Sequence, residues 1–297
     1  SKTIYTTFTG KRGMVLEMLL NPRKAERSPW ELFFIGLVYS SVAIFLSLLI
    51  FSDHIGLVMV FLTTLACTHL VHGAMRLEEK KDMSMTPHSE VSLLKEHSKA
   101  IEVFMFLFLG FVVAFSIWYI VLPTSMTQQI FGLQEDTINS VNAGISGNAI
   151  GEGFFAKIFV NNVKVLLFTL LFAFFYGAGS VFILSWNAAI VGVAVGSFAR
   201  NAIASVTREA GLLGASQYFS SYSLGLLRYL THGVFEIAAY FIAALAGGII
   251  SIAIARHDFN SPQFKHVALD ALDLMVISIV VLMFAAVVEV FVTPQLF

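Results

Sequence analysis

Four polar side chains recur every fourth residue inside one long apolar segment, residues 224–255: Arg228, His232, Glu236 and Tyr240. Steps of four residues on an α-helix turn by only about 40°, so these side chains form one stripe along the helix. At this spacing His232 and Glu236 can relay a proton or offer two ligands to a metal. Because a carboxylate is costly in hydrocarbon, we expect the stripe to face protein or water.

Asparagines interrupt the neighbouring apolar runs and are candidates to join this stripe. They are Asn161, Asn162 and Asn187. Polar residues at membrane depth indicate a functional centre by default, but they also serve as structural hydrogen bonds between helices, worth about 0.6 kcal/mol each. Glu289 is also surrounded by apolar residues, yet Thr293 and Pro294 follow it closely. We therefore expect Glu289 to reach the membrane interface.

The sequence favours no metal or cofactor. A third ligand beside His232 and Glu236 would have to come from His69 or His72, which the topology below places at the opposite membrane face. The chain has no phosphate-binding loop, no nucleophile elbow, no zinc-protease motif and no paired cysteines. An enzyme is therefore the least favoured class.

The composition is that of a membrane protein. Hydrophobic residues make up 57% of the 297 residues and charged residues only 12%, against about 25% in soluble domains. The apolar residues form long runs, which predicts an all-α, polytopic integral membrane protein with six or seven transmembrane helices. The net charge of −1 argues against a nucleic-acid partner, so the lipid bilayer is the expected surrounding.

Apolar runs of suitable length predict where the helices lie. The expected helices cover residues 30–51, 55–75, 101–122, 162–176, 181–199, 224–255 and 267–292. The apolar region 154–199 is too long for one crossing, and we divide it at residues 177–180, which gives seven crossings. If this region crosses only once or is re-entrant, the chain has six crossings.

These helices divide the chain into four parts. Residues 1–29 form a basic segment with an interfacial helix, and residues 30–122 hold three transmembrane helices. Residues 123–153 form a polar link, and residues 154–297 form a core that contains the intramembrane polar groups. The amino-terminal segment and the 76–99 link are rich in Lys and Arg, whereas 124–153 has none. The positive-inside rule therefore predicts a multi-pass cell-membrane protein with a cytoplasmic amino terminus and an extracytoplasmic 123–153 link.

Small residues recur at the four-residue spacing that lets transmembrane helices pack closely. They are Ala188, Gly192 and Gly196 in one helix, and the pairs Ala243/Gly247 and Ala244/Gly248 in another. Gly177 and Gly179 are further small residues, in the predicted turn. We expect the two helices to form a tight core. The surplus of such faces also predicts a homo-oligomer.

The carboxy-terminal half resembles the stage II sporulation protein M family over about residues 155–255. The resemblance rests on Asn161-Asn162, Gly177 and Gly179, Asn187, His232-Gly233, Glu236 and Gly247-Gly248. The family usually has Asn-Gly where this chain has Asn187-Ala188. The resemblance implies a polytopic helical membrane protein, and its founding member is a scaffold that holds peptidoglycan-remodelling enzymes during engulfment. It does not extend to residues 1–122, so we do not transfer the sporulation role.

Two functions remain open at this point. The first is a membrane scaffold or assembly protein that organises membrane or envelope partners through packed helices. The second is a transporter or channel that uses the His232/Glu236 polar centre, since broken helices with polar groups at membrane depth are common in transporters.

Overall fold

The computed structural model describes residues 28, 30–82, 95, 97–146, 152–176, 179–208, 212–256 and 261–296. Within these residues every regular element is a helix. In order they are α3 (Trp30–Ile50), α4 (Ile55–Asp82), α6 (Ser98–Val121), α7 (Thr124–Ser146), α8 (Glu152–Tyr176), α9 (Ser180–Arg208), α10 (Leu212–Arg256), α11 (Pro262–Val287), the π-helix η1 (Val288–Val292) and α12 (Thr293–Leu296). The interfacial helix expected in residues 1–29 lies outside the described residues.

Seven helices in the described part of the chain are long and apolar enough to cross a membrane. The spans are Trp30–Ile50, Ile55–Lys80, Ser98–Val121, Phe155–Phe174, Ser180–Ala204, Thr231–Ala255 and Pro262–Leu296. The polytopic helical fold is therefore confirmed. The apolar region 154–199 forms two separate helices, α8 and α9, which supports the seven-crossing arrangement over the six-crossing one.

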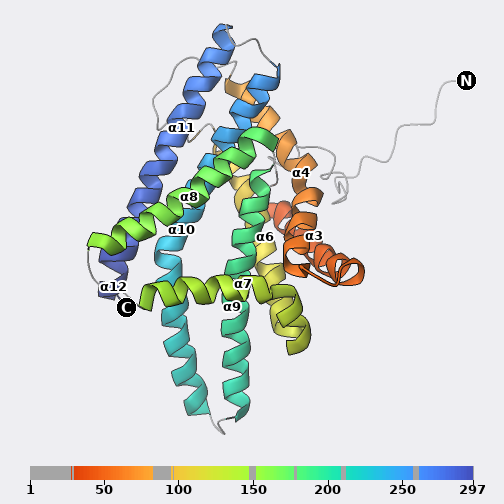
Figure 1. Ribbon diagram of the computed structural model, residues 1–297, viewed down its shortest axis with the longest axis vertical. Coiled ribbons are helices and arrows are strands. Elements are labelled where there is room, and N and C mark those ends of the chain that lie inside the picture. The colour runs from red at the N-terminus through yellow and green to blue at the C-terminus, as the bar shows by residue number, and fades with distance from the viewer. Residues whose placement is uncertain are drawn as a thin grey trace, which may run out of the picture.

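Several helices run further than their apolar segments predict. The polar 123–153 link contains the helix α7, and the 200–223 connection is helical at both ends, up to Arg208 and from Leu212. With 45 residues, α10 is about 68 Å long at 1.5 Å per residue, twice the thickness of the hydrocarbon core. Figure 1 shows the end of α9 and the start of α10 projecting together beyond α7, while α7 runs across the bundle.

Polar contacts fix α7 at the end of the α6 and α9 spans. Arg200 of α9 donates hydrogen bonds to the Tyr119 carbonyl (3.2 Å) and to the hydroxyls of Thr127 (3.3 Å) and Thr124 (2.9 Å). The Tyr119 hydroxyl donates to Glu135 of α7 at 2.6 Å. Arg200 thus satisfies a carbonyl at the carboxyl end of α6, where helices leave such groups unpaired. This corner holds α7 crosswise at one end of the bundle.

The small residues of α9 and α10 pack against helices of the same chain. A Cβ atom added at Gly192 would lie 2.7 Å from the Phe115 Cβ atom, and one added at Gly247 would lie 2.6 Å from the Ala173 Cβ atom. Gly196 similarly meets Tyr119, and Gly248 meets the Met75 side chain. Ala188 and Ala243 are fully buried. Helices α9 and α10 therefore use these faces against α6, α8 and α4, so the faces on which we based the homo-oligomer are filled from within the chain.

Helices α8, α10 and α11 form the part of the bundle that positions the polar residues. Helices α10 and α11 are antiparallel neighbours, and Phe235 stacks edge-on against Phe284 with centroids 5.0 Å apart. Helix α8 crosses obliquely in front of α10 (Figure 1) and begins where α11 ends, with Phe155 beside Phe291. The amino-terminal half of α8, the middle of α10 and the end of α11 therefore meet at one level.

Candidate functional site

The site is a cluster of polar side chains from α8, α10 and η1 inside the membrane-spanning part of the bundle. The Asn162 amide of α8 donates a hydrogen bond to the Glu236 carboxylate of α10. The His232 Nε2 atom lies 3.9 Å from a Glu289 carboxylate oxygen of η1. Asn162 and His232 are each 9% exposed. Two carboxylates thus enter the membrane interior, and each has a polar partner on another helix.

Glu289 reaches the cluster because the last helix changes its pitch. Pro294 has no backbone N–H group and its ring excludes the carbonyl of residue 290 from a normal helical position. The chain responds with the π-helix Val288–Val292, and the Thr293 hydroxyl donates to the Val288 carbonyl at 3.0 Å. Single π-helical turns are rare and occur often at functional sites. This turn determines which way Glu289 faces.

Tyr240 completes the buried side of the cluster. It lies one helical turn beyond Glu236 on α10 and is only 4% exposed. Its hydroxyl is near enough to Glu236 and Glu289 to interact electrostatically with both carboxylates. Glu236 and Glu289 are near enough for their charges to interact. The cluster therefore holds two acidic groups, an imidazole, an amide and a phenol.

The other candidate residues lie elsewhere. The Asn161 side chain is exposed on the outer face of α8. Asn187 donates to the Ile183 carbonyl of its own helix at 2.8 Å, so its amide is committed to α9. Arg228 is part of α10, but its side chain is outside the described residues, as is Gly177. Gly179 accepts a hydrogen bond from the Phe182 N–H group at the start of α9.

Sequence reasoning overlooked Glu289 as a member of the cluster. It predicted that this residue reaches the interface, because Thr293 and Pro294 follow it. The available signal was the proline itself: five residues after a carboxylate in an apolar run, it changes the helical register instead of ending the helix. No three His, Cys, Asp or Glu side chains of the described residues gather as a metal site.

These observations define a class: a multi-pass helical membrane protein with a hydrogen-bonded polar cluster between its spans. A model of the family described as stage II sporulation protein M matches residues 102–294, more than half of the chain. The chain belongs to this family. The match begins within α6 and extends through η1, so it includes every residue of the cluster, and it is wider than the 155–255 region that the sequence suggested.

A relative in an archaeon supports the family assignment. An uncharacterized protein of Methanocaldococcus jannaschii is 30% identical over 145 residues, which cover 48% of this chain and 72% of that protein. No solved structure matches the chain.

Proposed function

We propose that the chain is a membrane scaffold, which presents a rigid set of transmembrane helices to membrane or envelope protein partners. The observation that carries this proposal is how the intramembrane polar groups are used. Glu236 accepts from Asn162, and Glu289 faces His232, so each carboxylate ties two separate helices together. Intramembrane polar groups that are used for contacts between helices favour a rigid arrangement of those helices.

Close packing and family membership support the same function. Gly192, Gly247 and Gly248 bring α9 and α10 within van der Waals contact of their neighbours, which limits sliding between helices. The family model carries the description of a stage II sporulation protein. Membership of that family supports a non-enzymatic role in organising envelope components.

The charge pattern, together with seven spans, favours one orientation of the chain. Basic residues concentrate before α3 and over residues 76–99, which cover the end of α4, the α4–α6 connection and the first turn of α6. This pattern favours the cytoplasm for both segments. In that orientation α7 and the projecting ends of α9 and α10 lie outside the cytoplasm, in the cell membrane's outer interface and beyond. Envelope partners would meet the protein on this side.

Transport is the second candidate, and the coupled pair Glu236 and Glu289 favours it. Two carboxylates with an imidazole at membrane depth are typical of proton and cation pathways. The π-helix beside Glu289 adds to this, because such turns are common where helices do chemistry. The two functions differ in whether ions cross the membrane through the cluster.

The experiment is a paired measurement on wild type and Glu236→Gln. Both proteins are reconstituted in liposomes, proton, sodium and potassium fluxes are recorded under imposed gradients, and thermal unfolding is followed in the same samples. If the protein is a scaffold, the wild type shows no ion flux under an imposed gradient. Glu236→Gln then changes the melting temperature and nothing else that is measured. A wild-type flux that Glu236→Gln abolishes without unfolding the protein would overturn the scaffold in favour of transport.

A further inference from the structure

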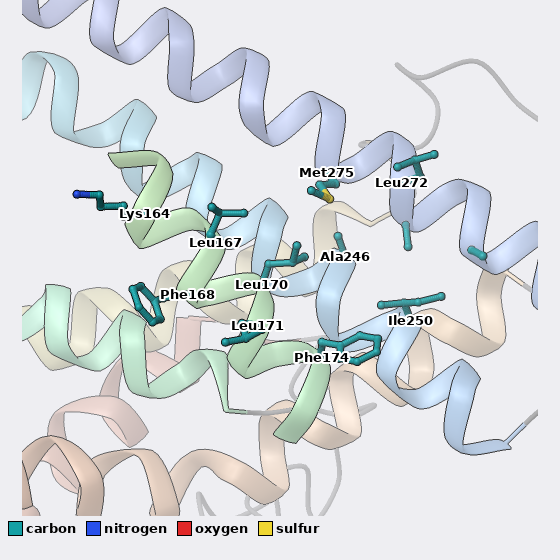
Figure 2. A pocket seen from close by; sticks show the side chains of 12 residues that line it. Lys164, Leu167, Phe168, Leu170, Leu171, Phe174, Ala246, Ile250, Leu272 and Met275 are labelled. Carbon is teal, nitrogen blue, oxygen red and sulfur yellow. The ribbon is translucent and has the colours of Figure 1, made fainter. Parts of the chain in front are cut away.

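A second site lies on the membrane-facing side of the same three helices. Helices α8, α10 and α11 leave an open groove of about 750 Å³ between them, on the side of the cluster away from η1. Eleven of its twelve lining residues are apolar, and the twelfth is Lys164. Figure 2 shows Lys164 at one end of the groove, with its ammonium group directed away from the apolar side chains. A cationic group next to an apolar groove is complementary to an anionic amphiphile.

Lys164 lies deep within the membrane. Phe241 of α10 contacts Phe104 and Phe108, which are near the middle of the α6 span. Glu236 is five residues before Phe241, and its partner Asn162 is two residues before Lys164. At 1.5 Å per residue, Lys164 is therefore roughly 5 Å from the level of Phe241. Its side chain is exposed, and a lysine at such depth is unfavourable unless an anion or water meets it.

Lys164 belongs to a polar stripe on the outer face of α8. Lys157, Asn161 and Lys164 are all exposed, and their spacing of four and three residues places them on one face of the helix. The stripe runs from the first turns of α8 to the end of the groove. Lysine stems extend toward the helix amino terminus and thus toward the nearer interface. An anionic head group along this stripe would meet two ammonium groups and one amide.

We propose that this stripe and the groove together bind a membrane lipid with a negatively charged phosphate head group. The phosphate lies over the amino-terminal part of the stripe, where Lys157 and Asn161 contact it and the Lys164 ammonium extends toward it. One hydrocarbon chain lies in the groove beside Ala246 and Met275. Lysine suits this role, because its compact charge binds phosphate without demanding a fixed geometry. A partner helix suits the groove less well, since a helix about 10 Å wide fills roughly 1,200 Å³ per ten residues.

Native mass spectrometry of the full chain in mild detergent tests the proposal. The protein is titrated with dioleoyl phosphatidylglycerol, which is anionic, and with dioleoyl phosphatidylcholine, which has the same chains but no net charge. We expect tighter binding of the anionic lipid. Lys164→Gln and Lys157→Gln should each weaken this binding about fivefold. Lys80→Gln, which removes an exposed lysine on α4, is the matched control and should leave it unchanged.

The groove is tested separately from the head-group contacts. Ala268→Phe places a ring in the groove and should weaken binding of both lipids. If this variant does not fold, dihexanoyl phosphatidylglycerol, whose chains are too short to fill the groove, should bind the wild type much more weakly than the dioleoyl form. Weaker lipid binding in either experiment supports the groove as the site of the hydrocarbon chain.

Two results would overturn the proposal. The first is that the wild type binds the two dioleoyl lipids equally well, and that the double variant Lys157→Gln/Lys164→Gln binds them as the wild type does. The other is a photo-reactive residue at position 171 that cross-links in native membranes to a protein and not to lipid, which would mean that a polypeptide covers this face.

Discussion

The two ends of the α8–α10–α11 unit differ in whether their polar side chains are paired within the chain or face the membrane. At one end Asn162, His232, Glu236 and Glu289 are drawn together between the helices. At the other end α8 and α11, both packed against α10, leave an apolar groove between them beside the exposed Lys164. Polar groups that find partners within the chain close the bundle. A charged group that faces outward leaves a surface for something else to cover.

Removal of the Asn162–Glu236 hydrogen bond should have the largest effect on stability. Asn162→Leu removes the amide that donates to Glu236 and leaves a buried carboxylate without this partner. We expect a loss of about 2–3 kcal/mol in stability, seen as a melting temperature lower by roughly 4–10 °C. Asn161→Leu is the matched control, because its side chain is exposed and the change should cost less than about 0.5 kcal/mol. Equal losses at both positions would contradict the assigned contact.

A smaller loss is expected from widening the contact between α8 and α10. Gly247→Ala adds a Cβ atom 2.6 Å from the Ala173 Cβ atom and 2.9 Å from the Leu170 carbonyl, so the helices must move apart. This should cost about 1–3 kcal/mol in thermal unfolding. Gly233→Ala, on the same helix, meets nothing within 4 Å and should be neutral or stabilising, since alanine favours a helix by about 1 kcal/mol over glycine. If Gly233→Ala destabilises the protein as much as Gly247→Ala does, the loss at Gly247 cannot be assigned to its close contact with α8.

The smallest expected effect is the coupling between α10 and η1. A double-mutant cycle of His232→Phe and Glu289→Leu should give an interaction energy of about 0.5–1.5 kcal/mol, typical of polar contacts between membrane helices. The measurement is thermal unfolding of the four proteins in one detergent. His232→Phe with Tyr39→Phe, on α3, serves as the uncoupled pair and should be additive. If the two substitutions are additive, His232 and Glu289 do not interact, and Glu289 does not belong to the cluster.

The amino-acid sequence by itself determined the type of the spans and left their number at six or seven. Long apolar runs suffice for the type, because backbone hydrogen bonds in a bilayer must be satisfied within each helix. The separate helices α8 and α9 of the structure support seven. The His232–Glu236–Tyr240 stripe was also local, since it depends only on the helical repeat. The family resemblance likewise came from residues close together in the chain, and the match to residues 102–294 confirmed it.

Only the tertiary structure decided which side chains meet. Asn161 and Asn162 are adjacent and chemically identical, yet the rotation of α8 turns one outward and the other to Glu236, 74 residues away. Glu289 joins them because a π-helical turn before Pro294 changes its direction. The small faces of α9 and α10 are likewise filled by neighbours that no local pattern identifies. Contacts of this kind depend on the relative rotation and depth of separate helices, and the repeat within one helix carries no information about either.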